Sequence, residues 1–251
     1  MEILALYNIK GGVGKTASAV NLAYESTRDG SRTLLWDLDP QGAATWCFRV
    51  RSEPRDPRRR LREGKVEKKK ELRRRIRATD FEGLDLVPAD FAYRHLDLAL
   101  ADAERPGERL RRLLRPFAGD YDYVILDCPP SLSLASENVF AIAGTLAVPT
   151  IPTTLSLRTL EQLREHLRRL ELTPRVLPFL TMVDRRKRLH RDLAAAGDPR
   201  MLRSAIPYAS AVEQMSVRRE PLARFASRSS AARAYEELWR EIRERLATSA
   251  Q

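Results

Sequence analysis

The chain has 251 residues, of which 43% are hydrophobic and 31% charged, and its net charge is +11, so it can bury a sizeable core and is expected to fold. Its two cysteines, Cys47 and Cys128, are too few for a disulfide scaffold or a four-thiolate metal site and suit a reducing cytoplasm. Because no apolar run approaches the roughly 20 residues that span a bilayer, and the N-terminus lacks the basic segment of a signal peptide, we expect a soluble cytoplasmic protein.

The first third of the chain predicts a βαβ unit. An apolar run over Ile3–Ile9 predicts a buried strand, and the stretch from about Lys15 to Arg28 predicts a helix that Gly30 ends. A glycine-rich turn at residues 10–16 separates the two. Thr33–Leu38 predicts the next strand, so strand, helix and strand follow within 38 residues, which implies parallel pairing. One helix face is formed by small and apolar residues: Ala19, Leu22, Ala23 and Ser26.

A strongly basic segment follows at residues 49–77. It holds 15 basic and 5 acidic residues, which is a net +10 and nearly the whole imbalance of the chain. Such a block attracts a polyanion, either nucleic acid or an anionic membrane surface. Its second half, from Arg62, has few apolar positions and predicts an exposed helix. We expect an extra DNA-contacting arm, with an acidic partner protein or a plain solvated loop as the alternatives.

The rest of the chain alternates strands with amphipathic helices. Because the strands are almost continuously apolar, both faces of the sheet should be covered. The predicted fold is α/β, a mostly parallel twisted sheet with helices on both faces, as one domain over residues 1–251 with the basic segment as an insertion. Pro178 is expected to make its strand less regular. The strands are Leu84–Val87, Tyr123–Leu126, Thr145–Val148 and Val176–Val183, and the helices are Gly107–Phe117, Leu157–Leu170, Arg186–Ala196 and Ser230–Leu246.

The turn between the first strand and helix has the chemistry of a phosphate-binding loop. Its sequence is KGGVGKT, residues 10–16, in which glycines let consecutive N–H groups point at phosphate oxygens beside the helix N-terminus. Lys15 would reach the β- and γ-phosphates, and the Thr16 hydroxyl would bind Mg²⁺. The usual first glycine is replaced by Ile9, and a second lysine, Lys10, stands ahead of two glycines.

This loop resembles that of the deviant Walker-A ATPases of the ParA/MinD family, whose pattern is K-G-G-x-x-K-[ST]. The resemblance implies a P-loop NTPase that binds ATP and Mg²⁺ and dimerises around ATP, with Lys10 reaching the partner's nucleotide. The nucleotide-binding residues that it implies here are Lys10, Gly11, Gly12, Val13, Gly14, Lys15, Thr16 and Ala17.

Two acidic segments strengthen the resemblance. An acid at the carboxyl end of a parallel strand faces the crevice where ligands bind, and residues 37–42, DLDPQG, match the family's D-x-D-P-Q-G segment. By resemblance, Asp39 would position the attacking water, while Asp37 supports the magnesium shell or the loop. Asp127 closes a Walker-B-like strand before a D-x-P-P switch. The implied catalytic residues are Lys10, Lys15 and Asp39, and the implied metal residues are Thr16, Asp37, Asp39 and Asp127.

The second half carries the base-side and DNA candidates. Met182 and Asp184 resemble the family's strand end beside the adenine, and Pro207 resembles a second base-contacting segment. The family usually has a basic residue and an Asn after that proline, whereas this chain has Tyr208 and Ala209. Surface cations could bind DNA phosphates. The candidates for this role are Arg185, Arg186, Lys187, Arg188, Arg218 and Arg219.

The resemblance thus implies a slow, partner-stimulated ATPase that binds DNA without sequence preference and segregates or positions a cargo. A ParB-like or cargo-adaptor protein would stimulate it, and it would be nucleoid-associated. The last predicted helix mixes Glu and Arg on its polar face, which argues against binding to anionic lipid. The alternative is a MinD-like or other nucleotide-dependent positioning scaffold whose DNA binding is incidental.

Overall fold

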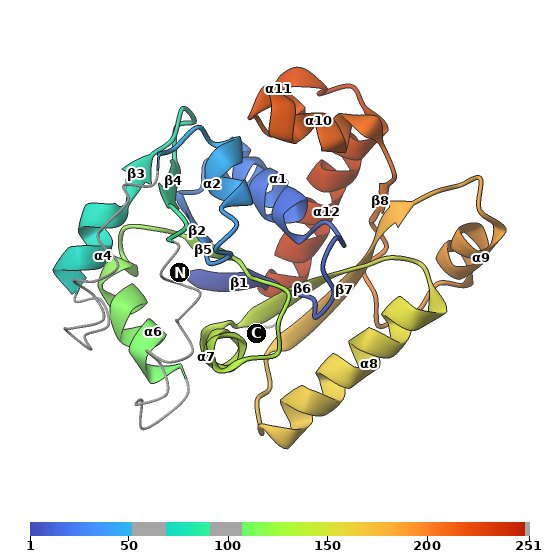
Figure 1. Ribbon diagram of the computed structural model, residues 1–251, viewed down its shortest axis with the longest axis horizontal. Coiled ribbons are helices and arrows are strands. Elements are labelled where there is room, and N and C mark those ends of the chain that lie inside the picture. The colour runs from blue at the N-terminus through green and yellow to red at the C-terminus, as the bar shows by residue number, and fades with distance from the viewer. Residues whose placement is uncertain (52–68, 91–106, 249–251) are drawn as a thin grey trace.

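An eight-stranded sheet organises the chain in the computed structural model, which describes residues 1–51, 69–90 and 107–248 (Figure 1). The strand order is β3-β4-β2-β5-β1-β6-β7-β8. Only β3 is antiparallel to its neighbour within this sheet, which confirms the predicted mostly parallel α/β fold. The strands are β1 (Glu2–Leu6), β2 (Thr33–Asp37), β3 (Arg77–Ala78), β4 (Leu84–Val87), β5 (Tyr123–Asp127), β6 (Thr145–Thr150), β7 (Arg175–Val183) and β8 (Ala205–Pro207).

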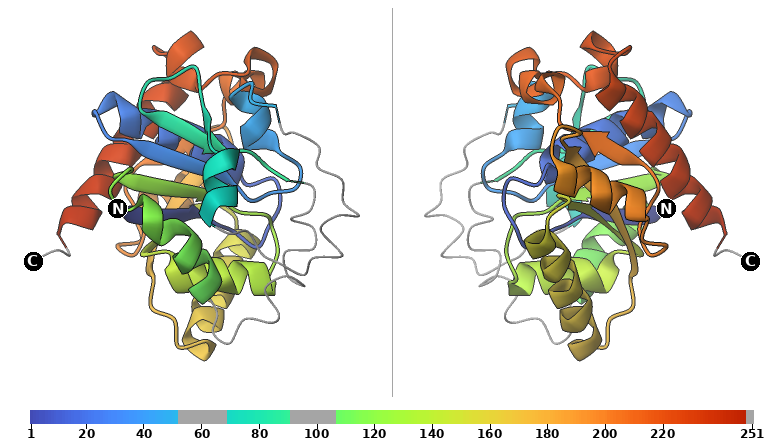
Figure 2. Two further views of the ribbon diagram at one scale, coloured as in Figure 1. Left: turned by 90° about the vertical axis from the view of Figure 1, so that its left-hand side faces the viewer. Right: turned by 90° about the vertical axis from the view of Figure 1, so that its right-hand side faces the viewer.

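Helices cover both faces of the sheet, as Figures 1 and 2 show. One face carries α1 (Lys15–Arg28), α2 (Ala43–Cys47), α10 (Ser210–Arg218), α11 (Leu222–Phe225) and α12 (Ser230–Ala247). The other carries α4 (Lys69–Arg75), α6 (Glu108–Leu114) with the 3₁₀ turn Arg115–Phe117, α7 (Leu134–Ile142) and α8 (Thr154–Arg169). Helix α9 (Arg188–Ala196) follows β7.

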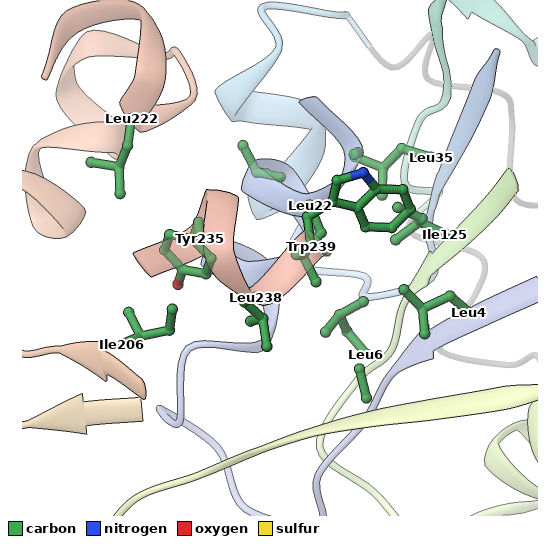
Figure 3. Packing of buried hydrophobic residues seen from close by; sticks show 14 of the residues in the cluster. Leu4, Leu6, Leu22, Leu35, Ile125, Ile206, Leu222, Tyr235, Leu238 and Trp239 are labelled. Carbon is green, nitrogen blue, oxygen red and sulfur yellow. The ribbon is translucent and has the colours of Figure 1, made fainter. Parts of the chain in front are cut away.

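The two cores arise from the alternation of side chains along the strands. In β1, Leu4 and Leu6 belong to the α1–α12 core, whereas Ala5 belongs to the other, because successive strand residues point to opposite faces. Figure 3 shows Leu4 and Leu6 beside Leu238 and Trp239 of α12. Tyr235, Leu238, Trp239 and Ile242 form the buried apolar side of α12. No helix within the described ranges is long and apolar enough to cross a membrane.

Strand β1 ends earlier than predicted, at Leu6 rather than Ile9. The reason is the buried Asn8, whose side-chain amide donates to the Pro149 carbonyl (2.8 Å) and whose side-chain oxygen accepts from the Lys10 N–H (2.9 Å). These bonds turn the backbone out of the sheet. The irregularity expected at Pro178 does not interrupt β7, which runs over nine residues. Pro178 lies before the point where β7 begins to pair with β8, so its missing N–H costs no ladder bond there.

The prediction of an exposed helix in the basic segment is wrong for its described part. Helix α4 packs onto the sheet, with Leu72 fully buried and Arg75 only 7% exposed. Arg73 bonds Asp120 (2.6 Å) and Arg75 lies 3.6 Å from Asp90. The few apolar positions in this stretch were therefore enough to anchor it. The remainder of the proposed arm, residues 52–68, lies outside the described residues.

Candidate nucleotide-binding site

Three neighbouring strands end at one level and gather the predicted acidic residues. In the register of the sheet, Asp37 of β2 pairs with Asp127 of β5, and Asp127 pairs with Leu6 of β1. The phosphate-loop sequence follows β1 and the Asp37–Gly42 segment follows β2, so both lie at the carboxyl edge of the sheet. This is the edge where ligands bind in open parallel sheets.

The glycine-rich loop has a backbone that needs glycine at two positions. Gly12 and Gly14 have φ of +71° and +83°, a region that residues with a side chain rarely adopt. A Cβ on Gly14 would lie 3.4 Å from the Thr181 hydroxyl, and one on Gly11 would lie 3.9 Å from a ring carbon of Pro130. The loop therefore lies between the carboxyl end of β7 and the Pro129–Pro130 segment.

Lys15 is held in place by the loop itself. Its side chain is buried, at 7% exposure, and its ammonium donates to the carbonyl of Lys10 (2.8 Å). Burial lowers the pKa of Lys15, while the negative charges of Asp127 and Asp39 act in the opposite direction. A poorly solvated ammonium of this kind gains strongly from an incoming anion. The Lys10 ammonium, in contrast, forms no ion pair with any described residue.

Asp127 provides the test of whether Mg²⁺ fits this site. Its carboxylate is fully buried, and neither oxygen has a hydrogen-bond partner among the described residues. Burial and the charge of Asp37 raise the pKa of Asp127, whereas the Thr16 hydroxyl and the Lys15 ammonium lower it. A buried, unsatisfied carboxylate is normally paired or bound to a cation, so this arrangement fits a divalent ion.

The donor set fits Mg²⁺ in particular. Within the described part of the chain, no group of three or more His, Cys, Asp or Glu side chains could hold a metal ion. Mg²⁺ commonly binds one or two protein oxygens together with substrate phosphates and water. Thr16 and Asp127 offer such a set next to the loop.

Asp37 and Asp39 differ in what they have left to offer. Both carboxylate oxygens of Asp37 accept protein hydrogen bonds, one from the N–H (2.8 Å) and hydroxyl (2.7 Å) of Thr45 and the other from the Asp39 N–H (3.2 Å). Burial raises the pKa of Asp37 to about 6. Among the described residues, the carboxylate of Asp39 accepts only the Gln41 N–H (2.9 Å), and Asp39 is partly exposed. These bonds indicate that Asp37 supports the loop, and they leave the Asp39 carboxylate available for a ligand or water.

The predicted base-side residues meet at the ends of β7 and β8. Val183 pairs with Pro207, and the ladder shifts register between Leu180 and Val183. At this shift Met182 has φ +53°, a strained backbone of the kind that gathers at functional sites. Asp184 accepts a two-pronged hydrogen bond from Arg186 (2.9 and 3.0 Å), which holds its pKa at about 2.

Tyr208, which departs from the family pattern, is 54% exposed at the end of β8. Its hydroxyl donates to Glu213 (2.9 Å), and its N–H donates to the Val183 carbonyl (3.1 Å). An aromatic ring thus stands where the family usually has a basic residue. Ala17 and Val13, the remaining predicted nucleotide residues, lie in the first turn of α1 and in the loop itself.

The six DNA candidates fall into two groups on different elements. Arg185, Arg186 and Lys187 are exposed between β7 and α9, and Arg188 is exposed at the start of α9. Arg218 is the last residue of α10, and Arg219 follows it. Three of the six already have partners: Arg186 binds Asp184, Arg188 lies 3.5 Å from Asp192, and the Arg219 guanidinium lies 4.1 Å from the centre of the Trp46 ring. The sequence reasoning missed Asn8, Thr45 and Trp46. For Asn8 the signal was a polar residue between an apolar strand and the glycine-rich loop.

Known proteins resemble this chain over most of its length. A family model described as "AAA domain" matches residues 1–177. The chromosome partitioning protein ParA of Caulobacter vibrioides is 31% identical, over 96% of this chain and 94% of its own length. The sporulation initiation inhibitor protein Soj of Bacillus subtilis is 30% identical, over 96% and 98%.

Solved structures agree on the fold. Cobyrinic acid a,c-diamide synthase from Mycobacterium smegmatis, with a bound ATP analog and magnesium, is 27% identical with a TM-score of 0.78, over 100% of this chain and 97% of that one. The cell division ATPase MinD of Pyrococcus furiosus is 20% identical with a TM-score of 0.74, over 97% and 98%. The chain therefore belongs to the ParA/MinD family of partitioning-type P-loop ATPases.

Proposed function

We propose that this chain, as one ATPase domain, is a slow and partner-stimulated switch that dimerises around ATP, binds DNA without sequence preference and positions a cargo. The observation that carries the proposal is the different state of the two loop lysines. Lys15 is buried and tied to the carbonyl of Lys10, whereas the side chain of Lys10 is only partly buried and forms no ion pair with a described residue. Lys10 is thus free to reach a second molecule.

Exposed apolar side chains at the same edge support dimerisation. Leu132, Leu134 and Leu155 are 46%, 44% and 60% exposed, at the segments that lead from β5 and β6 into α7 and α8. Hydrogen bonds join these segments to the end of β1, from the Tyr7 hydroxyl to the Ser131 carbonyl and from Asn8 to Pro149. Large apolar residues gathered beside a ligand site are typical of an interaction surface.

In the proposed reaction, water attacks the terminal phosphoryl group of ATP, and the protein acts mainly by positioning and by charge. ATP supplies the transferred group, and Mg²⁺ neutralises part of its charge. Thr16 and Asp127 would hold the ion, the loop N–H groups and Lys15 would bind the phosphates, and Asp39 would orient the water. Asp37, fixed by Thr45, would keep the Asp39 backbone in place.

For DNA we propose the exposed cations that have no strong internal partner. Arg185, Lys187 and Arg218 form no ion pair with described residues, and Arg188 lies 3.5 Å from the exposed Asp192. Arg186 and Arg219 would have to give up existing contacts in order to bind phosphate. Binding of this kind would place the protein on the nucleoid in the cytoplasm, and a ParB-like or cargo-adaptor protein would stimulate hydrolysis.

A binding measurement tests the proposal. The affinity for a random-sequence DNA duplex is measured at about 0.15 M salt with ATP, with ADP and without nucleotide. Tight binding with ATP alone is the expected result, because only the ATP-bound dimer would present two copies of the cations. Equal binding in all three states would contradict a nucleotide-gated DNA switch and favour the MinD-like scaffold with incidental DNA binding.

A variant that binds ATP but cannot hydrolyse it offers a second test. Asp39→Ala should leave ATP binding intact and stop hydrolysis, so the variant should accumulate as an ATP-bound dimer on size-exclusion chromatography. A variant that remains monomeric with ATP, while still binding it, would contradict dimerisation around the nucleotide.

A further inference from the structure

Two short helices from distant parts of the sequence are joined by side-chain hydrogen bonds at the carboxyl edge of the sheet. Helix α2 follows the Asp37–Gly42 segment, and α10 follows β8. The indole N–H of Trp46 donates to the Ser216 carbonyl (2.7 Å), and the Arg219 side chain donates to the Trp46 carbonyl (2.9 Å) while its guanidinium covers the indole ring. Trp46 is 54% exposed, so burial in the core does not account for this set of bonds.

A second arginine, which follows α2, also binds the end of α10. Arg49, just after α2, donates to the Arg218 carbonyl (3.3 Å) and forms an ion pair with Glu220. Arg49 and Arg219 have φ of +58° and +57°, a conformation that disfavours residues with a side chain and persists where surrounding contacts hold it. We name this set the α2–α10 clasp. Its members are Trp46, Arg49, Ser216, Arg219 and Glu220.

The clasp is connected to Asp39 through the backbone of α2 and two successive sets of hydrogen bonds. Thr45, next to Trp46 in α2, donates through its N–H and hydroxyl to one oxygen of Asp37 (2.8 and 2.7 Å). The other Asp37 oxygen accepts the Asp39 N–H (3.2 Å). The Thr45 hydroxyl also accepts from the Ala89 N–H (2.8 Å), which fixes it from the far side. A shift of α2 would therefore move Asp37 and, with it, the backbone of Asp39.

We infer that Trp46 and Arg219 are positioning residues for hydrolysis, because the clasp holds α2 where Thr45 and Asp37 set the place of Asp39. The inference rests on the proposed role of Asp39 in orienting the attacking water. It also joins the two ends of the site, since α10 leads away from the base side at Tyr208 and α2 from the acidic segment. A contact that acts on Asp39 from a distance can strongly affect the rate of hydrolysis, because small misplacements of reacting groups cost large factors in rate.

Single-turnover hydrolysis tests the inference. Trp46→Ala and Arg219→Ala should each lower the rate constant about tenfold, with the Kd for ATP within about twofold of the parent. Trp46→Phe keeps a ring beneath the guanidinium and should recover part of the rate. Because both residues act through one contact, the double variant should be little slower than either single variant. Val217→Ala is the matched control, since that side chain lies between Ser216 and Arg218 in α10 and is 80% exposed.

The fluorescence of Trp46 provides a second, spectroscopic measurement. Of its three tryptophans, Trp36 and Trp239 are 2% exposed, so acrylamide quenching of fluorescence reports on Trp46. Arg219→Ala should increase this quenching, because the guanidinium no longer covers the ring, whereas Val217→Ala should leave it unchanged. Unchanged quenching in Arg219→Ala would overturn the clasp.

The remaining outcomes separate this inference from the proposed function. A rate within about twofold of the parent in both clasp variants, with Asp39→Ala inactive, would overturn the clasp alone. A parallel loss of ATP affinity and thermal stability would show a merely structural role and would also overturn it. Normal hydrolysis by Asp39→Ala would remove the proposed role of Asp39, and the inference would fail with it.

Discussion

The nucleotide edge, which is the carboxyl edge of the sheet around Lys15, Asp37 and Asp127, is rich in charge. The surface at residues 185–191 and 218–219 is rich in charge as well, yet the charges of the two regions are organised in different ways. At the nucleotide edge, Lys15, Asp37 and Asp127 are buried, and each has either a defined partner or an unsatisfied group that a ligand would complete. Along residues 185–191 and 218–219 the cations are exposed except for the half-buried Arg219, and three of them, Arg186, Arg188 and Arg219, contact other side chains. Charge in a sequence therefore indicates a specific site only where the fold removes it from water, because water screens exposed charges.

The largest expected effect is at the nucleotide edge and concerns the two lysines. Lys15→Ala should weaken ATP binding about 100-fold, since it removes a buried, charged hydrogen-bond donor to phosphate. Lys10→Ala should leave ATP affinity nearly unchanged but abolish stimulated hydrolysis, because its side chain would act in the partner's site. Titration with a fluorescent ATP analogue measures both affinities. Equal losses in the two variants would mean that the loop does not divide the roles of its lysines.

A second expected effect is on stability and lies in the basic segment. Leu72→Ala should lower the free energy of unfolding by about 3 kcal/mol, because α4 buries this side chain completely. Arg74→Ala, on the exposed side of the same helix, should change it by less than about 0.5 kcal/mol. Urea unfolding monitored by circular dichroism compares the two. Equal values would show that α4 does not pack on the core. A deletion that tests the DNA-arm hypothesis should therefore remove residues 53–68 and spare α4.

A smaller effect is expected for a substitution of Asp127, which should change stability and the response to Mg²⁺ in opposite directions. Asp127→Asn should stabilise the ligand-free protein by about 1–2 kcal/mol, since it removes a buried carboxylate without a hydrogen-bond partner. The same change should weaken the effect of Mg²⁺ on ATP affinity. Thermal unfolding with and without Mg²⁺ and ATP tests both statements. A variant less stable than the parent in the absence of ligand would contradict the view that this carboxylate awaits a cation.

The smallest effect is expected among the exposed cations. Arg185→Ala and Lys187→Ala should each reduce the slope of log affinity for DNA against log salt by about one. Arg186→Ala should reduce it by less, because Arg186 already binds Asp184. DNA affinities measured at several salt concentrations decide this. Equal slopes for all three variants would show that internal pairing does not decide which cations contact phosphate.

The backbone of the candidate site was predictable where one local pattern combines residues for the turn with residues for the helix. Residues 10–16 combine glycines, lysines and a hydroxyl between a strand and a helix, and the structure forms α1 from Lys15 as the pattern predicts. In contrast, the engagement of Arg219 with Trp46 joins residues 173 positions apart in sequence. No periodicity or motif contains such a contact, because it depends on how α2 and α10 pack.

The sequence by itself determined the alternation of strands and helices, the phosphate loop and the acids at the strand ends, because these follow from local side-chain periodicity and backbone freedom. Only the tertiary structure decided that Asp37 is occupied by Thr45 while Asp127 is left unsatisfied, and that α4 belongs to the core. The physical reason is that burial and hydrogen-bond partners are set by distant segments brought together in the sheet. A residue's type states what it can bind, and its surroundings decide which of its atoms are still free.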